Sequence, residues 1–245
     1  MSVSPESYAV GVVLAAGLGT RVGADGNKAY LPLAGRSMVA WSVEAVARTP
    51  EIDRTVLVFR RGEHDMAQRM INTELDWATV ELVEGGDTRH GSELNVLRYL
   101  SADIESGSVD VVLIHDAARP LAGPELMRTA LATARRFGGA VPAVPAGDVV
   151  RAAPDGRITS AGDTALMRVQ TPQAFRAMPL LAAYRAAETD GFDGTDTSSC
   201  IQHYTDVEVH VFAGMTTNLK VTFADDVRIA AQLLQDRVRP DGAPR

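Results

Sequence analysis

The sequence predicts an α/β fold with a doubly wound, mostly parallel sheet that is covered by helices on both faces. Short apolar runs alternate along the chain with segments whose apolar residues recur at helical spacing. Tyr8–Leu14 is a continuous apolar run ending in glycines, as expected for a strand buried on both faces of a parallel sheet. With 245 residues, of which 46% are hydrophobic and 22% charged, the chain can bury a full core.

The first half of the chain alternates between strands and helices. Runs rich in Val, Ile and Leu predict strands at 8–14, 55–59, 80–83 and 109–114. Helical spacing predicts helices over 37–47, 64–72 and 92–99, the first with Ser37 as N-cap. Pro124–Phe137 reads as a helix that begins with proline and stops at Gly138-Gly139. Such a fold places its ligand crevice at the carboxyl ends of the strands, the edge where Asp116 falls.

The second half is organised differently. Residues 148–159 read as two short β-like runs joined by Pro154-Asp155-Gly156, a hairpin signature. We expect it to form an arm at about 146–168. A strand at 207–212 and a helix at 225–239 return to the core. The predicted organisation is one domain over 8–239, with 1–7 and 240–245 as flexible termini.

Charge and composition exclude several classes of protein. The formal net charge is −7, which argues against binding of nucleic acid through a general basic surface, so any polyanion must meet a local cluster of Arg and Lys. The single cysteine, Cys200, excludes an internal disulfide and a cysteine zinc cluster. We expect it to be a small half-buried side chain, with a nucleophile as the alternative.

Nothing in the sequence indicates a membrane partner. The apolar stretch at 9–16 is too short to span a bilayer, and the first residues, MSVSPES, lack the positive charge of a secretory signal. We therefore expect a cytoplasmic protein.

The stretch VVLAAGLGTRVGADGNK at 12–28 favours phosphate binding. Gly17 and Gly19 let the backbone approach a triphosphate and aim its N–H groups at the oxygens, while Arg21 and Lys28 add positive charge. A strand-to-helix turn with solvated cations would carry the same glycines, so this alternative stays open. No Gly-Lys pair is present for a Walker loop.

A nicotinamide-dependent oxidoreductase is a weak alternative. The glycines do not follow the GxGxxG spacing, and the second strand ends in Phe59-Arg60-Arg61 rather than in an acidic residue.

Five stretches together resemble a known family. The LAAGLGTR stretch with a lysine seven residues after its arginine resembles the signature loop of nucleotidyltransferases that couple a nucleoside triphosphate to a sugar or polyol phosphate. The other four are GGDTR at 85–89 with Ser92, HDAARP at 115–120, QTPQAF at 170–175 and NLKVTFADD at 218–226. Over residues 10–236 the chain is similar to the 2-C-methyl-D-erythritol 4-phosphate cytidylyltransferases, which make CDP-methylerythritol in the non-mevalonate isoprenoid pathway, and to their relatives that make CDP-ribitol.

The resemblance implies a Rossmann-like fold of the nucleotide-diphospho-sugar transferase type and a CTP site. Gly86, Asp87 and Ser92 would read the cytosine, while Arg119 would contact the nucleotide or pair with Asp116 when the site is empty. A plain βα turn with Ser92 as N-cap is the alternative for the first three. The residues that would wrap the CTP phosphates are Ala15, Ala16, Gly17, Gly19 and Thr20.

The resemblance also implies a catalytic arrangement. Asp116 would hold Mg²⁺ on the phosphate oxygens, and Lys220, in a strand-like NLKVT, would reach the triphosphate from the opposite wall. An aspartate that caps a turn and a lysine that points to solvent are the alternatives. In the implied reaction an acceptor phosphate oxygen attacks the α-phosphorus of CTP in line, so no general base is needed. The catalytic cations would be Arg21, Lys28 and Lys220.

The acceptor side departs from the family pattern. Where the family has a Thr after an Asp in the arm and an Arg eight residues before the Thr of TPQ, this chain has Val149 and Asp163. Thr195 matches a family position near the acceptor. The cations that could substitute are Arg151, Arg157 and Arg168, of which we assign Arg157 and Arg168, with Thr195, to the acceptor. Methylerythritol phosphate is the favoured acceptor; ribitol 5-phosphate and a CTP-binding protein without turnover are the alternatives.

The resemblance further implies a homodimer. The hairpin at 148–160 would reach towards the crevice of the neighbouring subunit. Burial of Val149, Val150 and Ile158 there would explain apolar residues on a two-stranded ribbon that is marginal by itself.

Overall fold

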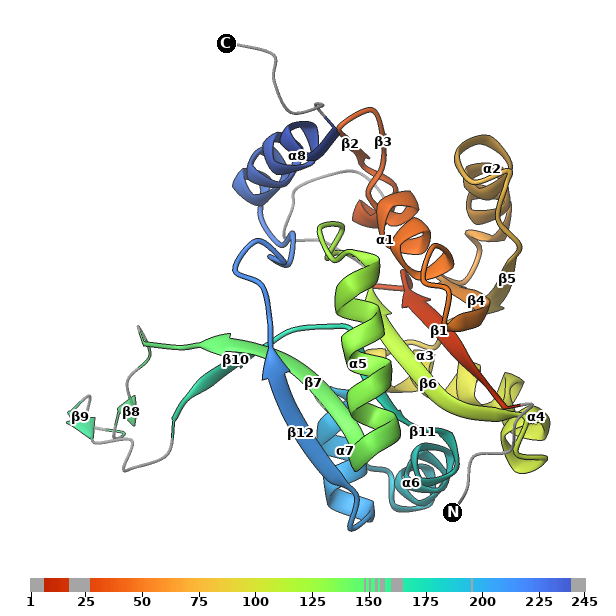
Figure 1. Ribbon diagram of the computed structural model, residues 1–245, viewed down its shortest axis with the longest axis vertical. Helices are drawn as coiled ribbons and strands as arrows, with labels where there is room; N and C mark the ends of the chain where they lie inside the picture. Colours follow the sequence, from red (N-terminus) through yellow and green to blue (C-terminus); the bar gives the residue numbers. More distant parts are fainter. Residues whose placement is uncertain are drawn as a thin grey trace.

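A mixed, mostly parallel sheet forms the centre of the molecule (Figure 1). This computed structural model describes residues 7–17, 27–147, 149, 151–152, 154, 157–159, 165–194 and 196–238. Within them the sheet has eight strands in the order β10-β7-β11-β6-β1-β4-β5, with β12 on β7. The strands are β1 (Tyr8–Leu14), β4 (Ile52–Phe59), β5 (Val80–Glu84), β6 (Val109–Asp116), β7 (Gly138–Pro145), β10 (Met167–Val169), β11 (Gln173–Arg176) and β12 (Glu208–Ala213).

Helices cover both faces of this sheet, which confirms the predicted α/β class. Side chains alternate along β1, so that Ala9 and Val13 join one apolar core and Val10 and Val12 the other. The first core is completed by α1 (Met38–Ala47), α2 (His64–Glu74) and α5 (Pro124–Phe137). The second is completed by α3 (Arg89–Tyr99), α4 (Ser101–Glu105), α6 (Ala177–Asp190) and α7 (Thr197–Tyr204).

A smaller apolar cluster lies beside the pocket described below. It joins Leu33, Leu121 and Val221 to Leu234 of α8 (Ala224–Val238). A short hairpin of β2 (Pro32–Leu33) and β3 (Arg36–Ser37) follows the 3-10 turn η2 (Lys28–Tyr30). None of the described helices combines the length and the apolar character that a bilayer crossing requires.

Several predicted elements differ from the structure in instructive ways. Strand β7 begins directly at Gly138, which the sequence indicated only as a helix stop, because its φ of 111° turns the chain straight from α5 into the sheet. Helix α3 begins at Arg89 rather than at residue 92, because the Thr88 side chain caps it by accepting from the Gly91 N–H. Ser37 lies at the N-cap position of α1, but its side chain makes no capping bond.

Two local predictions were wrong. The segment containing Lys220 is irregular rather than a strand: the Val221 N–H donates to the Ala118 carbonyl, and no strand pairs with it among the described residues. Cys200 is fully buried in the second core instead of half-buried. Burial raises the pKa of its thiol to about 12, which disfavours the nucleophile alternative.

The predicted hairpin is present. In it β8 (Arg151–Ala152) pairs antiparallel with β9 (Ile158–Thr159), and Figure 1 shows the pair beyond the end of β10, away from the body of the molecule. Residue 150, Asp163 and the segments expected as flexible termini, apart from Ser7, lie outside the described residues. Dimerisation through this arm stays a prediction.

Candidate active site

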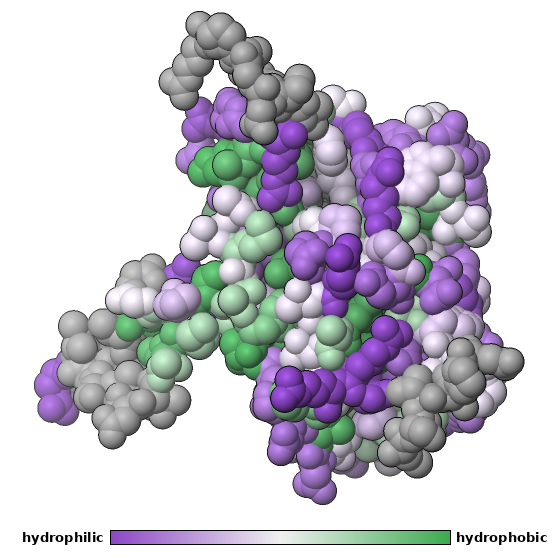
Figure 2. All heavy atoms as spheres, viewed as in Figure 1, coloured by the Kyte–Doolittle hydropathy of each residue, from purple (hydrophilic) through white to green (hydrophobic). Residues whose placement is uncertain are grey.

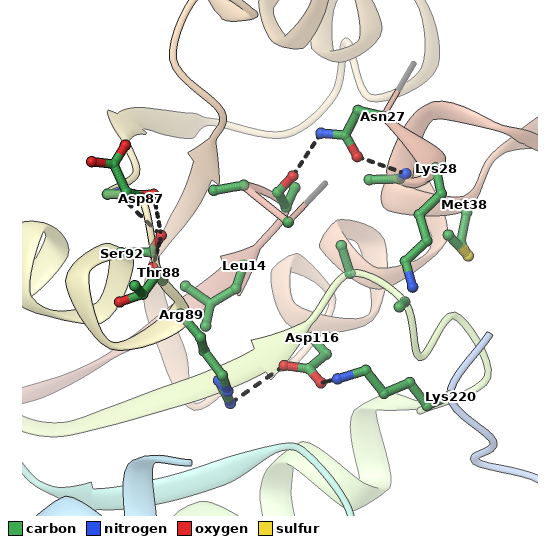
Figure 3. Close-up of a pocket in the computed structure, with 17 residues that line it drawn as sticks. Leu14, Asn27, Lys28, Met38, Asp87, Thr88, Arg89, Ser92, Asp116 and Lys220 are labelled. Atoms are coloured by element: carbon green, nitrogen blue, oxygen red, sulfur yellow. Dashed lines mark hydrogen bonds and ion pairs between the residues drawn. The ribbon is translucent and has the colours of Figure 1, made fainter. Parts of the chain in front are cut away.

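One pocket of about 370 Å³ opens at the carboxyl ends of β1 and β6 and the start of α3 (Figure 3). The two strands are parallel neighbours, with Leu14 in register with Asp116, so the start of the glycine stretch and the aspartate reach the same edge. The pocket is lined by residues 14–17, 27–29, 86–89, 116–118, Met38, Ser92 and Lys220.

The structure brings most of the predicted site residues to this pocket. Those lining it are Ala15, Ala16, Gly17, Lys28, Gly86, Asp87, Ser92, Asp116 and Lys220. Gly19, Thr20, Arg21 and Thr195 lie outside the described residues. Arg119, Arg157 and Arg168 are described but do not line the pocket. The positions support a common site, while the roles stay predictions.

Asp116 is the electrostatic centre of the pocket. One carboxylate oxygen accepts from Lys220 Nζ at 2.7 Å, and the other lies 3.3 Å from Arg89 Nη2 (Figure 3). Burial favours the neutral acid, but Arg89 and Lys220 outweigh it and hold the pKa of Asp116 well below its ordinary value. The carboxylate is therefore ionised at any physiological pH.

A buried hydrogen-bond chain fixes the backbone of Asp116. The Asp116 N–H donates to Thr171 Oγ1 at 3.0 Å, and Thr171 Oγ1 lies 3.1 Å from His115 Nδ1. The other ring nitrogen of His115 lies 3.1 Å from the Arg119 carbonyl, which can only accept, so Nε2 carries the proton and Nδ1 accepts from Thr171. Burial lowers the pKa of His115 to about 4, which keeps the imidazole neutral.

The TPQ and NLK stretches contact each other at this support, and of the two only NLK reaches the pocket, through Lys220. Asn218 Nδ2 donates to the Thr171 carbonyl at 2.9 Å, and Gln170 Nε2 donates to the Met215 carbonyl at 2.8 Å. These bonds join residues more than forty positions apart and fix the segment 215–218, which directly precedes Lys220 in the chain. The two stretches thus connect the backbone of Asp116 to the segment that carries Lys220.

Arg119 belongs to the same support. Its Nη1 donates to the Asn218 carbonyl at 2.7 Å and its Nη2 to the Val169 carbonyl at 3.4 Å. No ion pair joins it to Asp116 in the described part of the chain, so of its two alternatives the pairing with Asp116 is not seen. Its Nε is buried without a hydrogen-bond partner among the described residues. A contact of Arg119 with the nucleotide stays a prediction.

Lys28 enters the pocket from the wall opposite Ser92 (Figure 3). Its Nζ donates to the Val221 carbonyl at 3.0 Å, next to Lys220 in sequence. The preceding residue, Asn27, ties the end of the glycine stretch to its beginning, because Asn27 Nδ2 donates to the Ala15 carbonyl at 2.8 Å. Sequence reasoning missed this anchor, which holds Lys28 beside the strand end.

The wall formed by residues 85–92 is a tight turn onto α3. The Gly86 N–H donates to Ser92 Oγ at 3.1 Å, and Ser92 Oγ donates to the Thr88 carbonyl at 2.9 Å. A Cβ on Gly86 would lie 2.7 Å from the Gly91 carbonyl carbon, closer than real contacts allow. The glycine is therefore needed for the close approach of the turn, and Ser92 serves inside α3 rather than as its N-cap.

Arg89 is a site residue to which sequence reasoning gave no role. It was quoted within the GGDTR stretch, and the structure directs its guanidinium across the pocket to Asp116. Its second partner is the buried Glu93, whose Oε1 accepts from Arg89 Nη1 at 2.8 Å. An arginine in the first turn of a helix that starts at a ligand crevice was the available signal.

The donor set around Asp116 fits a magnesium ion. Mg²⁺ prefers hard oxygen ligands and often takes only one or two carboxylates from the protein, with phosphate oxygens and water completing its shell. Asp116 supplies such an ionised oxygen inside the pocket. Its present partners are cations, which a metal would have to displace from one oxygen. Among the described residues no cluster of three or more His, Cys, Asp or Glu offers another site.

Of the predicted acceptor residues, Arg168 lies on β10, where the arm leaves the sheet, and Arg157 lies within the arm itself. Arg168 is exposed on β10 opposite Val144, and Arg157 is exposed between β8 and β9 in sequence. Val149 is also exposed, with 47% of its surface accessible.

Comparison with known proteins gives one family over most of the chain. The model of the family "2-C-methyl-D-erythritol 4-phosphate cytidylyltransferase" matches residues 9–236. A protein of that name from Cereibacter sphaeroides is 38% identical, covering 91% of this chain and 95% of the relative. Another from Geobacter metallireducens is 34% identical, covering 93% and 97%.

Solved structures give the same picture of the fold. The 4-diphosphocytidyl-2C-methyl-D-erythritol synthase from Anaerococcus prevotii superposes with a TM-score of 0.79 at 26% identity, covering 94% of this chain and 96% of that one. A 2-C-methyl-D-erythritol 4-phosphate cytidylyltransferase from Thermus thermophilus gives a TM-score of 0.69 at 26% identity, covering 91% and 98%.

Proposed function

The chain belongs to the 2-C-methyl-D-erythritol 4-phosphate cytidylyltransferase family, and on that premise we propose that it transfers CMP from CTP to 2-C-methyl-D-erythritol 4-phosphate. The products are CDP-methylerythritol and pyrophosphate. The observation that carries the proposal is the pocket itself, where Lys220 and Arg89 flank one ionised carboxylate and Lys28 lines the same cavity.

The reaction follows from charge placement. A phosphate oxygen of the acceptor forms a bond to the α-phosphorus of CTP, while the bond from that phosphorus to the oxygen bridging to the β-phosphate breaks. The electron pair leaves with pyrophosphate, so negative charge grows on the leaving group. Lys28 and Lys220, which both line the pocket, would stabilise that charge, and Arg21 would join them by resemblance. The nucleophile is already an anion, so no side chain has to accept a proton.

Asp116 is the residue that would hold Mg²⁺, and the ion would supply neutralisation of the phosphate oxygens. Arg89 and Lys220 keep the Asp116 carboxylate ionised and ready to serve as an oxygen ligand. The hydrogen bonds from the Asp116 N–H to Thr171 and from Thr171 to His115 fix the backbone of Asp116, and this in turn restricts the position of its carboxylate.

The turn at 85–92 is the proposed cytosine site. Gly86 and Ser92, whose N–H and hydroxyl bond within the turn, would exchange these bonds for the carbonyl acceptor and amine donor of cytosine, whereas uracil presents the opposite pattern at the amine position. The residues proposed to wrap the phosphates are Ala15, Ala16, Gly17, Gly19 and Thr20.

A homodimer formed through the arm is part of the proposal. Met167, Val169 and Val211 are exposed apolar side chains near the base of the arm, and Figure 2 shows apolar surface gathered there. A ribbon whose strands have two residues each is marginal alone, and a partner would stabilise it. Light scattering at micromolar concentration should give twice the chain mass, and a monomer would contradict the dimer. A cytoplasmic location stays a prediction.

The activity is tested by a pyrophosphate-release screen that combines the four nucleoside triphosphates with methylerythritol 4-phosphate, ribitol 5-phosphate and related polyol phosphates. We expect release only with CTP, and with methylerythritol 4-phosphate as the best acceptor. Absence of turnover with that acceptor overturns the assignment. Release with ribitol 5-phosphate instead would move the enzyme to the other acceptor, and binding of CTP without release would indicate a protein that has lost turnover.

A further inference from the structure

Glu93 is a carboxylate in the interior of the protein. It lies on α3, on the side away from solvent, with 1% of its surface exposed. Desolvation raises the pKa of its carboxyl group, although the Arg89 guanidinium opposes that change. Burying an acidic side chain at such a position costs free energy, because the carboxylate loses its solvation by water. An apolar side chain of the same volume would fill the space without that loss. Its contribution to net stability therefore does not explain its presence.

The partners of Glu93 come from three elements. Tyr184 Oη of α6 donates to Oε2, and Thr197 Oγ1 of α7 donates to Oε1 at 2.7 Å. Arg89 Nη1 donates to the same Oε1 at 2.8 Å. Two hydroxyls from the second core thus hold the carboxylate in one orientation, and the carboxylate in turn holds one arm of a guanidinium.

Arg89 bridges this buried group to the pocket. Its other terminal nitrogen lies 3.3 Å from Asp116 Oδ1, while Lys220 approaches Asp116 Oδ2 (Figure 3). Because Arg89 divides its two terminal nitrogens between two carboxylates, it makes a single contact with Asp116. An arginine without the second partner is free to form a two-pronged pair with one carboxylate, the geometry that a guanidinium prefers.

We propose that Glu93 is a positioning residue for the cytidylyl transfer, which holds Arg89 so that it neutralises Asp116 without covering its carboxylate. The inference rests on the proposed function. Without Glu93, Arg89 would close on Asp116 and compete with Lys220 and with the metal for the same oxygens. Triphosphate binding and the transfer step would both suffer, although Glu93 itself touches no substrate.

The test compares Glu93→Gln with wild type in pyrophosphate release and in CTP binding by calorimetry with and without Mg²⁺. Gln has the same shape but no charge to hold Arg89. We expect kcat to fall about tenfold and the Kd for CTP with Mg²⁺ to rise about tenfold, while the KM for the acceptor stays within twofold. If the acceptor KM rises as much as the Kd for CTP, or if neither kcat nor the Kd for CTP changes, the proposal is overturned.

A double-mutant cycle separates positioning from a merely structural role. In an Arg89→Met background, Glu93 has no guanidinium left to hold, so adding Glu93→Gln should change kcat and the Kd for CTP by less than twofold. If the two effects multiply instead, Glu93 acts independently of Arg89 and the proposal fails. Where Glu93→Gln is too unstable to assay, Tyr184→Phe and Thr197→Val carry the test. Each should lower kcat about threefold, and unchanged kcat in both would contradict the proposal.

The control is Glu188→Gln, which breaks an exposed ion pair with Arg98 between the same two helices, α3 and α6. It should leave kcat and the Kd for CTP within twofold of wild type. If wild type binds CTP but releases no pyrophosphate with any acceptor, the proposed function fails, whereas the calorimetric comparison still decides the role of Glu93.

Discussion

The pocket wall around Asp116 and the arm formed by β8 and β9 differ in the number of contacts that hold them to the rest of the protein. Asp116 ends an eight-residue strand that pairs with β1 on one side and β11 on the other, and buried hydrogen bonds fix its backbone. The arm strands have two residues each, and the described positions around them, such as Val149 and Arg157, are exposed. The nucleotide side of the proposed site is thus set by the core, whereas the acceptor side depends on a ribbon that a partner would complete.

The largest effect is expected from Asp116→Asn, which removes the anion between Lys220 and Arg89. Without it the two cations repel each other and the proposed metal ligand is lost. We expect kcat/KM for CTP to fall about 1,000-fold, equivalent to roughly 4 kcal/mol. Pyrophosphate release measures it. Asp225→Asn, in an exposed ion pair with Arg228, is the matched control and should stay near wild type. A fall in kcat/KM of less than tenfold in Asp116→Asn would contradict a central role of Asp116 in the reaction.

The next effect is expected from Lys220→Met. This change removes a cation that points at the pocket centre, and one such group is worth about 100-fold in turnover, or roughly 3 kcal/mol. The same assay measures it, with Arg228→Met as the exposed control. If Lys220→Met raises only the acceptor KM and leaves the parameters for CTP unchanged, the lysine binds the acceptor. That result would contradict its assignment to the nucleotide side of the site.

Mild acid should lower the free energy of unfolding through His115, which supports the backbone of Asp116. The pKa of His115 is lowered in the folded protein, from 6.5 to about 4, so between these values the unfolded chain binds more protons than the folded one. Stability from this residue is fully present above pH 6.5 and falls as the pH drops towards 4. From pH 6.5 to 5 the loss is about 2 kcal/mol.

Urea unfolding at several pH values measures this loss. In His115→Gln the fall in unfolding free energy over the same range should be smaller by about that amount. His64→Gln, at an exposed position of α2, should follow the wild-type curve. Equal curves for wild type and His115→Gln would contradict the neutral buried imidazole.

The smallest effect is expected on the acceptor side. Arg168→Ala should raise the KM for methylerythritol 4-phosphate about fivefold, roughly 1 kcal/mol, because an exposed arginine holds a phosphate weakly. The Kd for CTP should not change. Arg185→Ala, in an exposed pair with Glu105 far from the pocket, is the control. An increase in the Kd for CTP matching that in the acceptor KM would erase the distinction between the two sides.

The sequence predicted the features that depend on neighbouring residues. The strand predicted at 109–114, which extends to Asp116 in the structure, the helix Pro124–Phe137 and the hairpin were found because apolar runs, proline, glycine and turn residues act locally. The glycine stretch and Asp116 were placed at one edge by the general rule for parallel sheets, and the structure has the start of that stretch and Asp116 there.

The remaining features depend on contacts between distant parts of the chain. Thr171 supports Asp116 across 55 positions, and Thr197 reaches Glu93 across 104. No local pattern reveals which hydroxyl will find a buried partner. Helix α6 is a different case, because its Gly191 C-cap, at a φ of 68°, was a local signal that the sequence reading passed over.

A crystal structure with CTP and Mg²⁺ tests the central claim most directly. We expect the Nζ atoms of Lys28 and Lys220 at about 3 Å from phosphate oxygens, with the cytosine against Gly86 and Ser92. A nucleotide bound elsewhere, or both lysines directed away from the triphosphate, would contradict the account.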